Sequence, residues 1–181
     1  MNVNRRLALL LLICFTCSSR LVAQDRAQAD KESCRQFTQA FYSWYVAKVF
    51  ESFDHKNTDA LLEALGYKGQ PFSRELVQGI RSVRTEEKKS HEAILDFDPI
   101  LNTQDPAEHY LVREVTERNG QFLVEIYGIW NAPRTELGKG PQVVAELTHM
   151  QDRWMFINFH YPNSVYPASE NLVSMLKFAL R

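Results

Sequence analysis

The feature that most restricts the fold is a change of hydrophobic period near the middle of the chain. Before residue 90, apolar residues recur three and four positions apart, as they do on one face of an α-helix. From Tyr110 onward they recur at every second position, as on one face of a β-strand. Helical and strand segments that are separated along the chain favour an α+β domain over a parallel βαβ sheet.

Three helices are expected before residue 90. Ser33 is placed to cap the first, whose apolar stripe consists of Phe37, Phe41, Trp44, Tyr45 and Val49. The second begins at Asn57 or Thr58 and ends at Gly66, a residue free to take a positive φ. Ser73 caps the third, whose charged end at 84–89 is expected to be solvated. We expect the aromatic stripe to pack in the core rather than to form a ligand cage.

Four strands are predicted in two hairpins, at residues 110–117, 121–130, 142–149 and 153–161. The first hairpin turns at Asn119-Gly120, the dipeptide most typical of a tight hairpin, and the second near Gln151-Asp152. Ser169 is placed to cap a final helix. The prediction is therefore a set of N-terminal helices on a curved antiparallel sheet of about four strands, with a short C-terminal helix.

Both faces of the second hairpin are rich in apolar residues. One side carries Val143, Ala145, Leu147, Trp154 and Phe156. The other carries Val144, Met155, Ile157 and Phe159. A sheet with one solvated face would alternate more regularly with polar residues. We therefore expect the second face to be covered by the C-terminal helix, by a ligand, or by a partner such as a second copy in a homodimer, unless the sheet closes into a cone.

The N-terminus has the pattern of a secretory signal peptide. Arg5 and Arg6 precede nine almost entirely apolar residues at 7–15, fewer than the roughly 20 needed to span a bilayer. A polar stretch then leads to the small residue Ala23. We expect residues 1–23 to be removed on export to the periplasm or the medium; a buried N-terminal helix is the alternative.

Two cysteines near this apolar run raise the question of a lipid anchor. Lipid attachment needs a small residue directly before the cysteine, but Ile13 precedes Cys14 and Thr16 precedes Cys17. No other stretch of the chain approaches membrane-spanning length. We therefore expect a soluble mature protein that is not lipidated.

The mature chain is expected to consist of a flexible lead-in at 24–32 and a single globular domain at 33–181. Residues 1–23 hold three of the 21 Lys and Arg residues and none of the 22 Asp and Glu residues, so the remainder has a formal net charge of −4. This charge provides no electrostatic footprint for nucleic acid. Cys34 is then the one remaining cysteine, which excludes an internal disulfide, and we interpret it as an ordinary thiol without a redox role.

The most distinctive polar segment lies at 96–105. Its carboxylates and amides belong to Asp96, Asp98, Asn102, Gln104 and Asp105. Hard cations such as Ca²⁺ prefer oxygen ligands of this kind. The spacing departs from the helix–loop–helix calcium pattern, because Ile100 occupies a ligand position and the required glycine and distal glutamate are missing. Turn formation, a ligand or partner surface, and metal binding are the three interpretations.

Two further polar pairs are candidates for chemistry. A two-residue turn at 119–120 would place Glu114 opposite Glu125, an unfavourable pair of like charges, so that either the register differs, or both face water, or a cation lies between them. Alternation along the last strand places Asn158 and His160 on the side of Trp154 and Phe156, either at a strand end that runs into solvent, which we favour, or at the mouth of an apolar cavity. The chain carries none of the short motifs of zinc proteases, P-loop enzymes, dinucleotide-binding folds or serine hydrolases, so no catalytic residue is assigned and no cofactor is expected.

Three pieces of sequence taken together resemble one known family. They are Phe-Tyr-Ser-Trp-Tyr at 41–45, Asp-Phe-Asp-Pro at 96–99 running into Asn-Thr-Gln-Asp at 102–105, and residues 154–161 ending in Asn-Phe-His-Tyr. Their order and spacing resemble the exported bacterial family called domain of unknown function 3828, over most of the chain from Cys34. Ile100 is a departure, since the family often has Phe after Asp-Pro.

The resemblance implies a nuclear transport factor 2-like architecture, in which helices lie against a strongly curved sheet. It implies no established activity and supplies no catalytic residues. Our first hypothesis is a non-enzymatic envelope module that binds a protein partner or a small ligand. The alternatives are a small hydrolase or isomerase that uses Asp or Glu with His inside the cone, and a metal-binding module at 96–105.

The signal peptide is tested by the mass of the mature protein. Intact mass spectrometry of the protein recovered from its bacterial host is expected to show the 158 residues that remain of 181 after cleavage at Ala23, beginning at Gln24. A full-length mass, or a chain that begins at a lipidated Cys17, would contradict the prediction.

Overall fold

The computed structural model describes residues 3–55, 58–130, 140–162 and 170–180, with side chains from residue 25 onward. It has the predicted α+β order of helices, antiparallel sheet and C-terminal helix. The helices are α1 (Val3–Asp54), α2 (Ala60–Ala64), the 3₁₀ turn η1 (Tyr67–Gly69), α3 (Arg74–Ser90) and α4 (Leu172–Ala179). The strands are β1 (His109–Arg118), β2 (Gln121–Ile129), β3 (Val143–Met150) and β4 (Arg153–His160).

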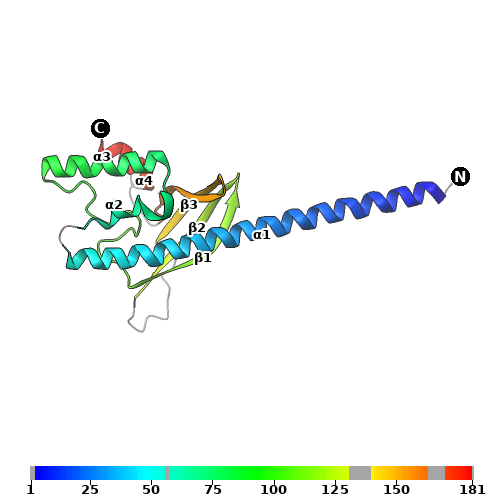
Figure 1. Ribbon diagram of the computed structural model, residues 1–181, viewed down its shortest axis with the longest axis horizontal. Helices are drawn as coiled ribbons and strands as arrows, with labels where there is room; N and C mark the ends of the chain where they lie inside the picture. Colours follow the sequence, from blue (N-terminus) through cyan, green and yellow to red (C-terminus); the bar gives the residue numbers. More distant parts are fainter. Residues whose placement is uncertain (1–2, 56–57, 131–139, 163–169, 181) are drawn as a thin grey trace.

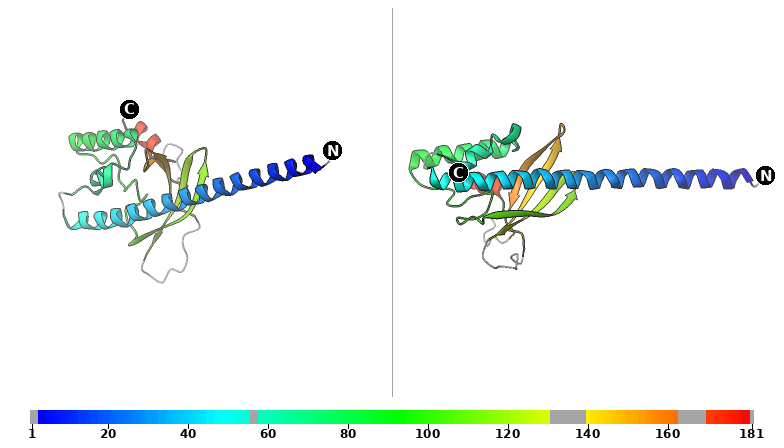
Figure 2. Two further views of the ribbon diagram at one scale, coloured as in Figure 1. Left: turned by 45° about the vertical axis from the view of Figure 1, so that its right-hand side comes forward. Right: turned by 60° about the horizontal axis from the view of Figure 1, so that its bottom comes forward.

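The four strands form one antiparallel sheet in the order β1-β2-β3-β4. The sheet curves around the C-terminal half of α1, which packs mainly against β1, while α3 and α4 pack together beside β4 (Figures 1 and 2). The N-terminal half of α1 extends beyond the sheet (Figure 1). Across the described part of the chain, no helix combines the length and the apolar character needed to cross a membrane.

The first helix was predicted to begin at Ser33, but in the structure it begins upstream of that residue. α1 already includes residues 24–32, which are rich in Ala, Gln, Asp, Glu, Lys and Arg and contain neither Gly nor Pro. Most of these residue types favour a helix, so nothing local stops α1 upstream of Ser33. Inside the helix, the Ser33 hydroxyl accepts a hydrogen bond of 3.0 Å from Trp154 Nε1 and so ties α1 to β4.

The caps of the shorter helices are local side-chain contacts. Ser73 caps α3 as predicted, by accepting from the Leu76 N–H. α2 was predicted to begin at Asn57 or Thr58, but it begins at Ala60 and is capped by Asp59. Asn171 caps α4; the predicted cap, Ser169, lies outside the described residues. Gly66 has a φ of −98° and so does not use the positive φ expected of it.

Both hairpin turns were predicted correctly. Asn119 and Gly120 have φ values of 55° and 76°, so both central residues of the two-residue turn are left-handed, as the tightest hairpins require. Gln151 and Asp152 in the second turn are also left-handed, with φ values of 51° and 58°. Each turn sets the register of its two strands, β1 with β2 and β3 with β4, over the residues next to the turn.

Two bulges shift the register farther from the turns. In β1 the register shifts between Val112 and Val115, so Arg113 and Glu114 both stand opposite Glu125 without a one-to-one Cα partner, and on its other side Glu125 pairs with Val144 on β3. In β4 the register shifts around Ile157. Because an extra residue exchanges the two faces of a strand, Phe159 is buried, and Asn158 and His160 do not share a face with Trp154 and Phe156.

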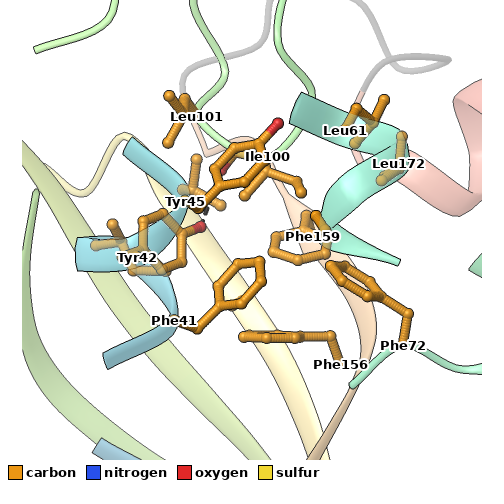
Figure 3. Close-up of a cluster of buried hydrophobic side chains, with 14 of the residues drawn as sticks. Phe41, Tyr42, Tyr45, Leu61, Phe72, Ile100, Leu101, Phe156, Phe159 and Leu172 are labelled. Carbon is orange, nitrogen blue, oxygen red and sulfur yellow. Dashed lines mark hydrogen bonds between the residues drawn. The ribbon is translucent and has the colours of Figure 1, made fainter. Parts of the chain in front are cut away.

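An aromatic cluster fills the space between α1 and the sheet (Figure 3). The ring of Phe156 lies at its centre, 4.8 Å from that of Phe41 and between 5.2 and 5.5 Å from those of Phe37, Phe72 and Phe159. Each fully buried Phe contributes about 1.5–3 kcal/mol relative to an exposed one. The aromatic stripe of α1 is therefore packed in the core, as predicted.

The thiol of Cys34 is part of the same core. Cys34 is completely buried, and this burial raises the pKa of its thiol to about 12. A thiol that stays protonated at neutral pH is a poor nucleophile and a poor metal ligand. The structure therefore agrees with the interpretation of Cys34 as an unreactive thiol.

The first hairpin turn can be tested with two glycine substitutions. We expect Gly120→Ala to destabilise the protein by about 1 kcal/mol, because an L side chain is strained at a positive φ. Gly66→Ala is the control, because φ is negative there and the nearest atom to an added Cβ is the Glu63 carbonyl oxygen at 3.6 Å. Urea unfolding measures both. Equal midpoints for the two variants would contradict the turn geometry.

Candidate functional site

Asp98 is the anchor of the polar segment 96–105. Its Oδ1 accepts hydrogen bonds of 2.9 Å from the N–H groups of both Ile100 and Leu101. Its Oδ2 accepts one of 2.7 Å from the hydroxyl of Tyr45 on α1. The Asp98 N–H in turn donates to the Thr103 carbonyl, which closes the loop on itself. The carboxylate of Asp98 therefore shapes a turn and binds that turn to α1.

Four tyrosine hydroxyls from three parts of the chain hold the segment 98–107. Besides Tyr45, Tyr42 donates to the Ile100 carbonyl at 2.9 Å, and Tyr161, which follows β4, donates to the Pro99 carbonyl at 2.7 Å. Tyr110 on β1 accepts from the Ala107 N–H at 3.3 Å. We call Tyr42, Tyr45, Tyr110 and Tyr161 the tyrosine cluster; Figure 3 shows its α1 members beside Ile100 and Leu101.

Burial sets the protonation of these groups. It raises the pKa of Tyr42, Tyr45 and Tyr161 well above the ordinary tyrosine value, and that of Tyr110 to about 12. Burial also raises the pKa of Asp98, although the hydrogen bonds from Tyr45 and from the Leu101 and Ile100 N–H groups act in the opposite direction. The hydroxyls stay protonated at neutral pH and can donate their hydrogen bonds throughout the physiological range.

A cleft of about 860 Å³ opens on the solvent side of Asp98. We call it the helix-end cleft, because the C-terminal end of α1, the start of α2, the side chain of Arg84 on α3 and the loop at 93–106 surround it. Its apolar lining includes Phe53, Leu61, Leu95 and Phe97, and its polar lining includes Ser52, Thr58, Asp59, Arg84, Asp96, Asp98, Thr103 and Gln104. Three carboxylates and one guanidinium therefore face or border the same space.

Arg84 joins three of these walls. Its Nε lies 3.1 Å from Asp59 Oδ2 at the start of α2, and its Nη1 lies 2.7 Å from Glu87 Oε2. The other oxygen of Glu87 accepts hydrogen bonds of 2.9 Å from the N–H groups of Ile94 and Leu95. The charged end of α3 was predicted to be solvated; at Arg84 and Glu87 it is instead half-buried and structural, because it connects α2, α3 and the loop.

The charge on Glu87 is favoured by these contacts. Its partial burial alone would raise its pKa. The hydrogen bonds from the Leu95 and Ile94 N–H groups and the Arg84 guanidinium lower the pKa by more than burial raises it, so that it lies below the ordinary glutamate value. Glu87 is therefore ionised at neutral pH and holds both Arg84 and the loop backbone. The position of the cleft's loop wall is thus determined at one end by Glu87 and at the other by Asp98.

The structure separates the other predicted residues of the segment. Asp96 and Gln104 are exposed and line the cleft, whereas Asp105 is exposed but lies outside it. Within the described part of the chain, the carboxylates of Asp96 and Asp105 make no hydrogen bond or ion pair. Asn102 has a φ of 53°, and its Nδ2 donates to the Gln142 carbonyl at 3.2 Å, which fixes the loop to the residue before β3. Asp98, Asp96 and Gln104 are thus brought together, and Asn102 and Asp105 are not.

Asn158 and His160 lie away from the cleft. Asn158 Oδ1 accepts from the N–H groups of Phe159 and Val173, and its Nδ2 donates to Asn171 Oδ1, so this side chain positions α4. His160 Nε2 lies 2.8 Å from Glu146 Oε2, and both border a separate depression on the sheet. The carboxylates of the helix-end cleft and this histidine do not share a pocket, and they are not assembled as the acid and base of one reaction.

Metal binding at 96–105 finds no support in the arrangement of donors. Among the residues that the structure describes, no group of three or more His, Cys, Asp or Glu side chains is placed to hold a metal ion. Asp98 turns inward to backbone N–H groups, while Asp105 points to solvent outside the cleft. The carboxylates of the segment therefore do not converge.

Sequence reasoning missed two sets of residues at this site. One is the pair of charged partners of Arg84, namely Asp59 and Glu87; the spacing of Arg84 and Glu87 on one helical turn signals a contact between them, but not their burial. The other is the tyrosine cluster, of which Tyr42 and Tyr45 lie three positions apart on one helix face. Their common target, the loop at 98–107, is a tertiary contact without a local signal.

Comparison of the chain with protein-family models, with curated proteins and with solved structures gave no match.

Asp98 and Asp105 provide a matched test of the turn. We expect Asp98→Ala to destabilise the protein by about 3 kcal/mol, because it leaves two N–H groups and the Tyr45 hydroxyl without their acceptor. Asp105→Ala, in the same loop but exposed, is expected to change stability by less than about 0.5 kcal/mol. Urea unfolding followed by circular dichroism gives both values; similar losses would show that Asp98 is not the anchor.

Proposed function

We propose that this chain is an exported, non-catalytic binding module of the bacterial cell envelope, and that its ligand site is the helix-end cleft. The observation that carries the proposal is a cleft of about 860 Å³ whose loop wall is held by partly buried hydrogen bonds at Asp98 and Glu87. Small-molecule sites usually measure about 300–1,000 Å³ and are largely formed before the ligand binds. A cleft whose walls are fixed in this way loses little conformational entropy on binding.

The side chains at the cleft favour binding over catalysis. Among its described lining residues there is no His, Cys or Lys. The hydroxyls of Ser52, Thr58 and Thr103 donate to nearby backbone carbonyls, and Asp98 and Arg84 are engaged in structural contacts. Catalysis by proton transfer needs a group that is free to exchange a proton with a bound substrate. Among the described residues, Asp96 is the one carboxylate of the lining that makes no hydrogen bond or ion pair, and no second free acid or base lies beside it there.

Membership of the exported family proposed from the sequence is supported by the physical connection between its three motifs. The piece at 41–45 supplies Tyr45, which bonds to Asp98 in the piece at 96–99, and the piece at 154–161 ends in Tyr161, which bonds to Pro99. Tyr42 bonds to the carbonyl of Ile100, directly after the second piece. The motifs thus maintain the fold around the cleft, and the ligand specificity belongs to other lining residues.

The cleft can be tested by filling it. Ala93 is exposed and lines the cleft, so Ala93→Trp should occupy it without disturbing the core. A library of small polar and apolar fragments is screened by ¹⁵N NMR, and we expect the shift changes to cluster at Leu95, Thr103 and Gln104 and to disappear in Ala93→Trp. Ser82→Trp, exposed on α3 and outside the cleft, is the control and should keep them.

Binding that survives Ala93→Trp, or shift changes that cluster at the depression beside His160 instead, would contradict the assignment of the site.

A further inference from the structure

We infer that the ligand of the helix-end cleft is an amphipathic organic cation, a small molecule with an ammonium group and an apolar body. This inference rests on the proposed function and specifies its ligand class. Three observations carry it: the charge balance of the cleft, the absence of a hydrogen-bond or ion-pair partner for Asp96 among the described residues, and the aromatic side chains of the lining.

The charge balance of the cleft is negative. Its lining contains the carboxylates of Asp59, Asp96 and Asp98 and the guanidinium of Arg84. Arg84 is already neutralised from two sides, by Asp59 at 3.1 Å and by Glu87 at 2.7 Å. An anionic ligand would therefore meet a negative field from the described lining, whose cation is already paired, whereas a cationic ligand would be attracted into the cleft.

Asp96 is the carboxylate available to such a cation. It is exposed, lines the cleft, and makes no hydrogen bond or ion pair within the described part of the chain. Asp98, by contrast, already accepts three hydrogen bonds from protein groups. An ammonium group that pairs with Asp96 gains an interaction without breaking one that the fold needs.

Apolar side chains line the other part of the cleft. Phe53, near the end of α1, is 62% exposed, which is unusual for a side chain of this size, and its ring contacts that of Phe50 edge-on at a centroid distance of 5.8 Å. Phe97 is half-buried and stands next to Asp96 in the chain, with its ring held edge-on against Tyr161. An apolar body attached to the ammonium group can cover these rings and remove them from water.

The size of this apolar wall favours a small molecule over a protein partner. A specific protein interface buries about 1,200–2,000 Å² in total and needs a broad contact surface. The exposed large apolar residues of the described chain are instead distributed over different elements, at Phe50, Phe53, Leu62, Leu111, Met150, Phe178 and Leu180. Only Phe53 among them lines the cleft.

Three probes that share an octyl chain test the inference: n-octylammonium, n-octanol and n-octanoate. ¹⁵N NMR titration of the purified protein gives a dissociation constant for each from the shifts of Leu95, Thr103 and Gln104. We expect octylammonium to bind about tenfold more tightly than octanoate, with octanol in between, and the difference to shrink as salt is added.

Two matched variants locate the charge. Asp96→Asn is expected to weaken octylammonium binding by about threefold, the size typical of an exposed ion pair, and to leave octanol binding unchanged. Asp105→Asn changes the same charge in the same loop but outside the cleft, so it should leave all three affinities unchanged.

The remaining outcomes would overturn the inference in distinguishable ways. If octanol or octanoate binds at the cleft as tightly as octylammonium, or if Asp96→Asn has no more effect than Asp105→Asn, the cationic ligand class is wrong and the binding site stands. If none of the probes shifts the cleft amides at millimolar concentration, the inference is also overturned, and the fragment screen with Ala93→Trp decides separately whether the cleft binds anything.

Discussion

The hydrogen bonds of the Asp98 carboxylate are the interaction on which the rest of this structure depends. A carboxylate that leaves water must recover its hydrogen bonds inside the protein, and Asp98 does so with two N–H groups of its own loop and the hydroxyl of Tyr45 on α1. These bonds close the turn and attach it to the longest helix. Because the same loop forms a wall of the helix-end cleft, one carboxylate connects the core to the proposed binding site.

Much of the fold could be predicted because its signals are local. The change of period, the turn at Asn119-Gly120 and the cap at Ser73 depend on residues close together in sequence, and the structure has all of them. The errors have two causes, one local and one in the tertiary structure. α1 continues through residues 24–32 because their helix propensity outweighs the capping tendency of Ser33. The bulge at Ile157 moves Phe159 into the core, and nothing in the alternation of β4 announces it.

The candidate site was predicted only in part, for the same physical reason. The composition of 96–105 indicated a polar segment with a common role, and Asp98 has that role as the anchor of a turn. The partners that give the cleft its shape come from other elements: Asp59 precedes α2, while Arg84 and Glu87 lie on α3. Which charged residues of a helix end become buried depends on what packs against it, and that information is absent from the helix itself.

The most direct test of this account is amide hydrogen exchange at Ile100 and Leu101 in the wild-type protein and in Tyr45→Phe. The substitution removes one donor to Asp98 and keeps the ring that stacks on Phe41. We expect faster exchange at Ile100, Leu101 and the loop wall, with Val124 and Ile126 in β2 still protected. Unchanged exchange at Ile100 and Leu101 would show that the loop is held without the Tyr45–Asp98 bond, and would contradict the central role given to that carboxylate.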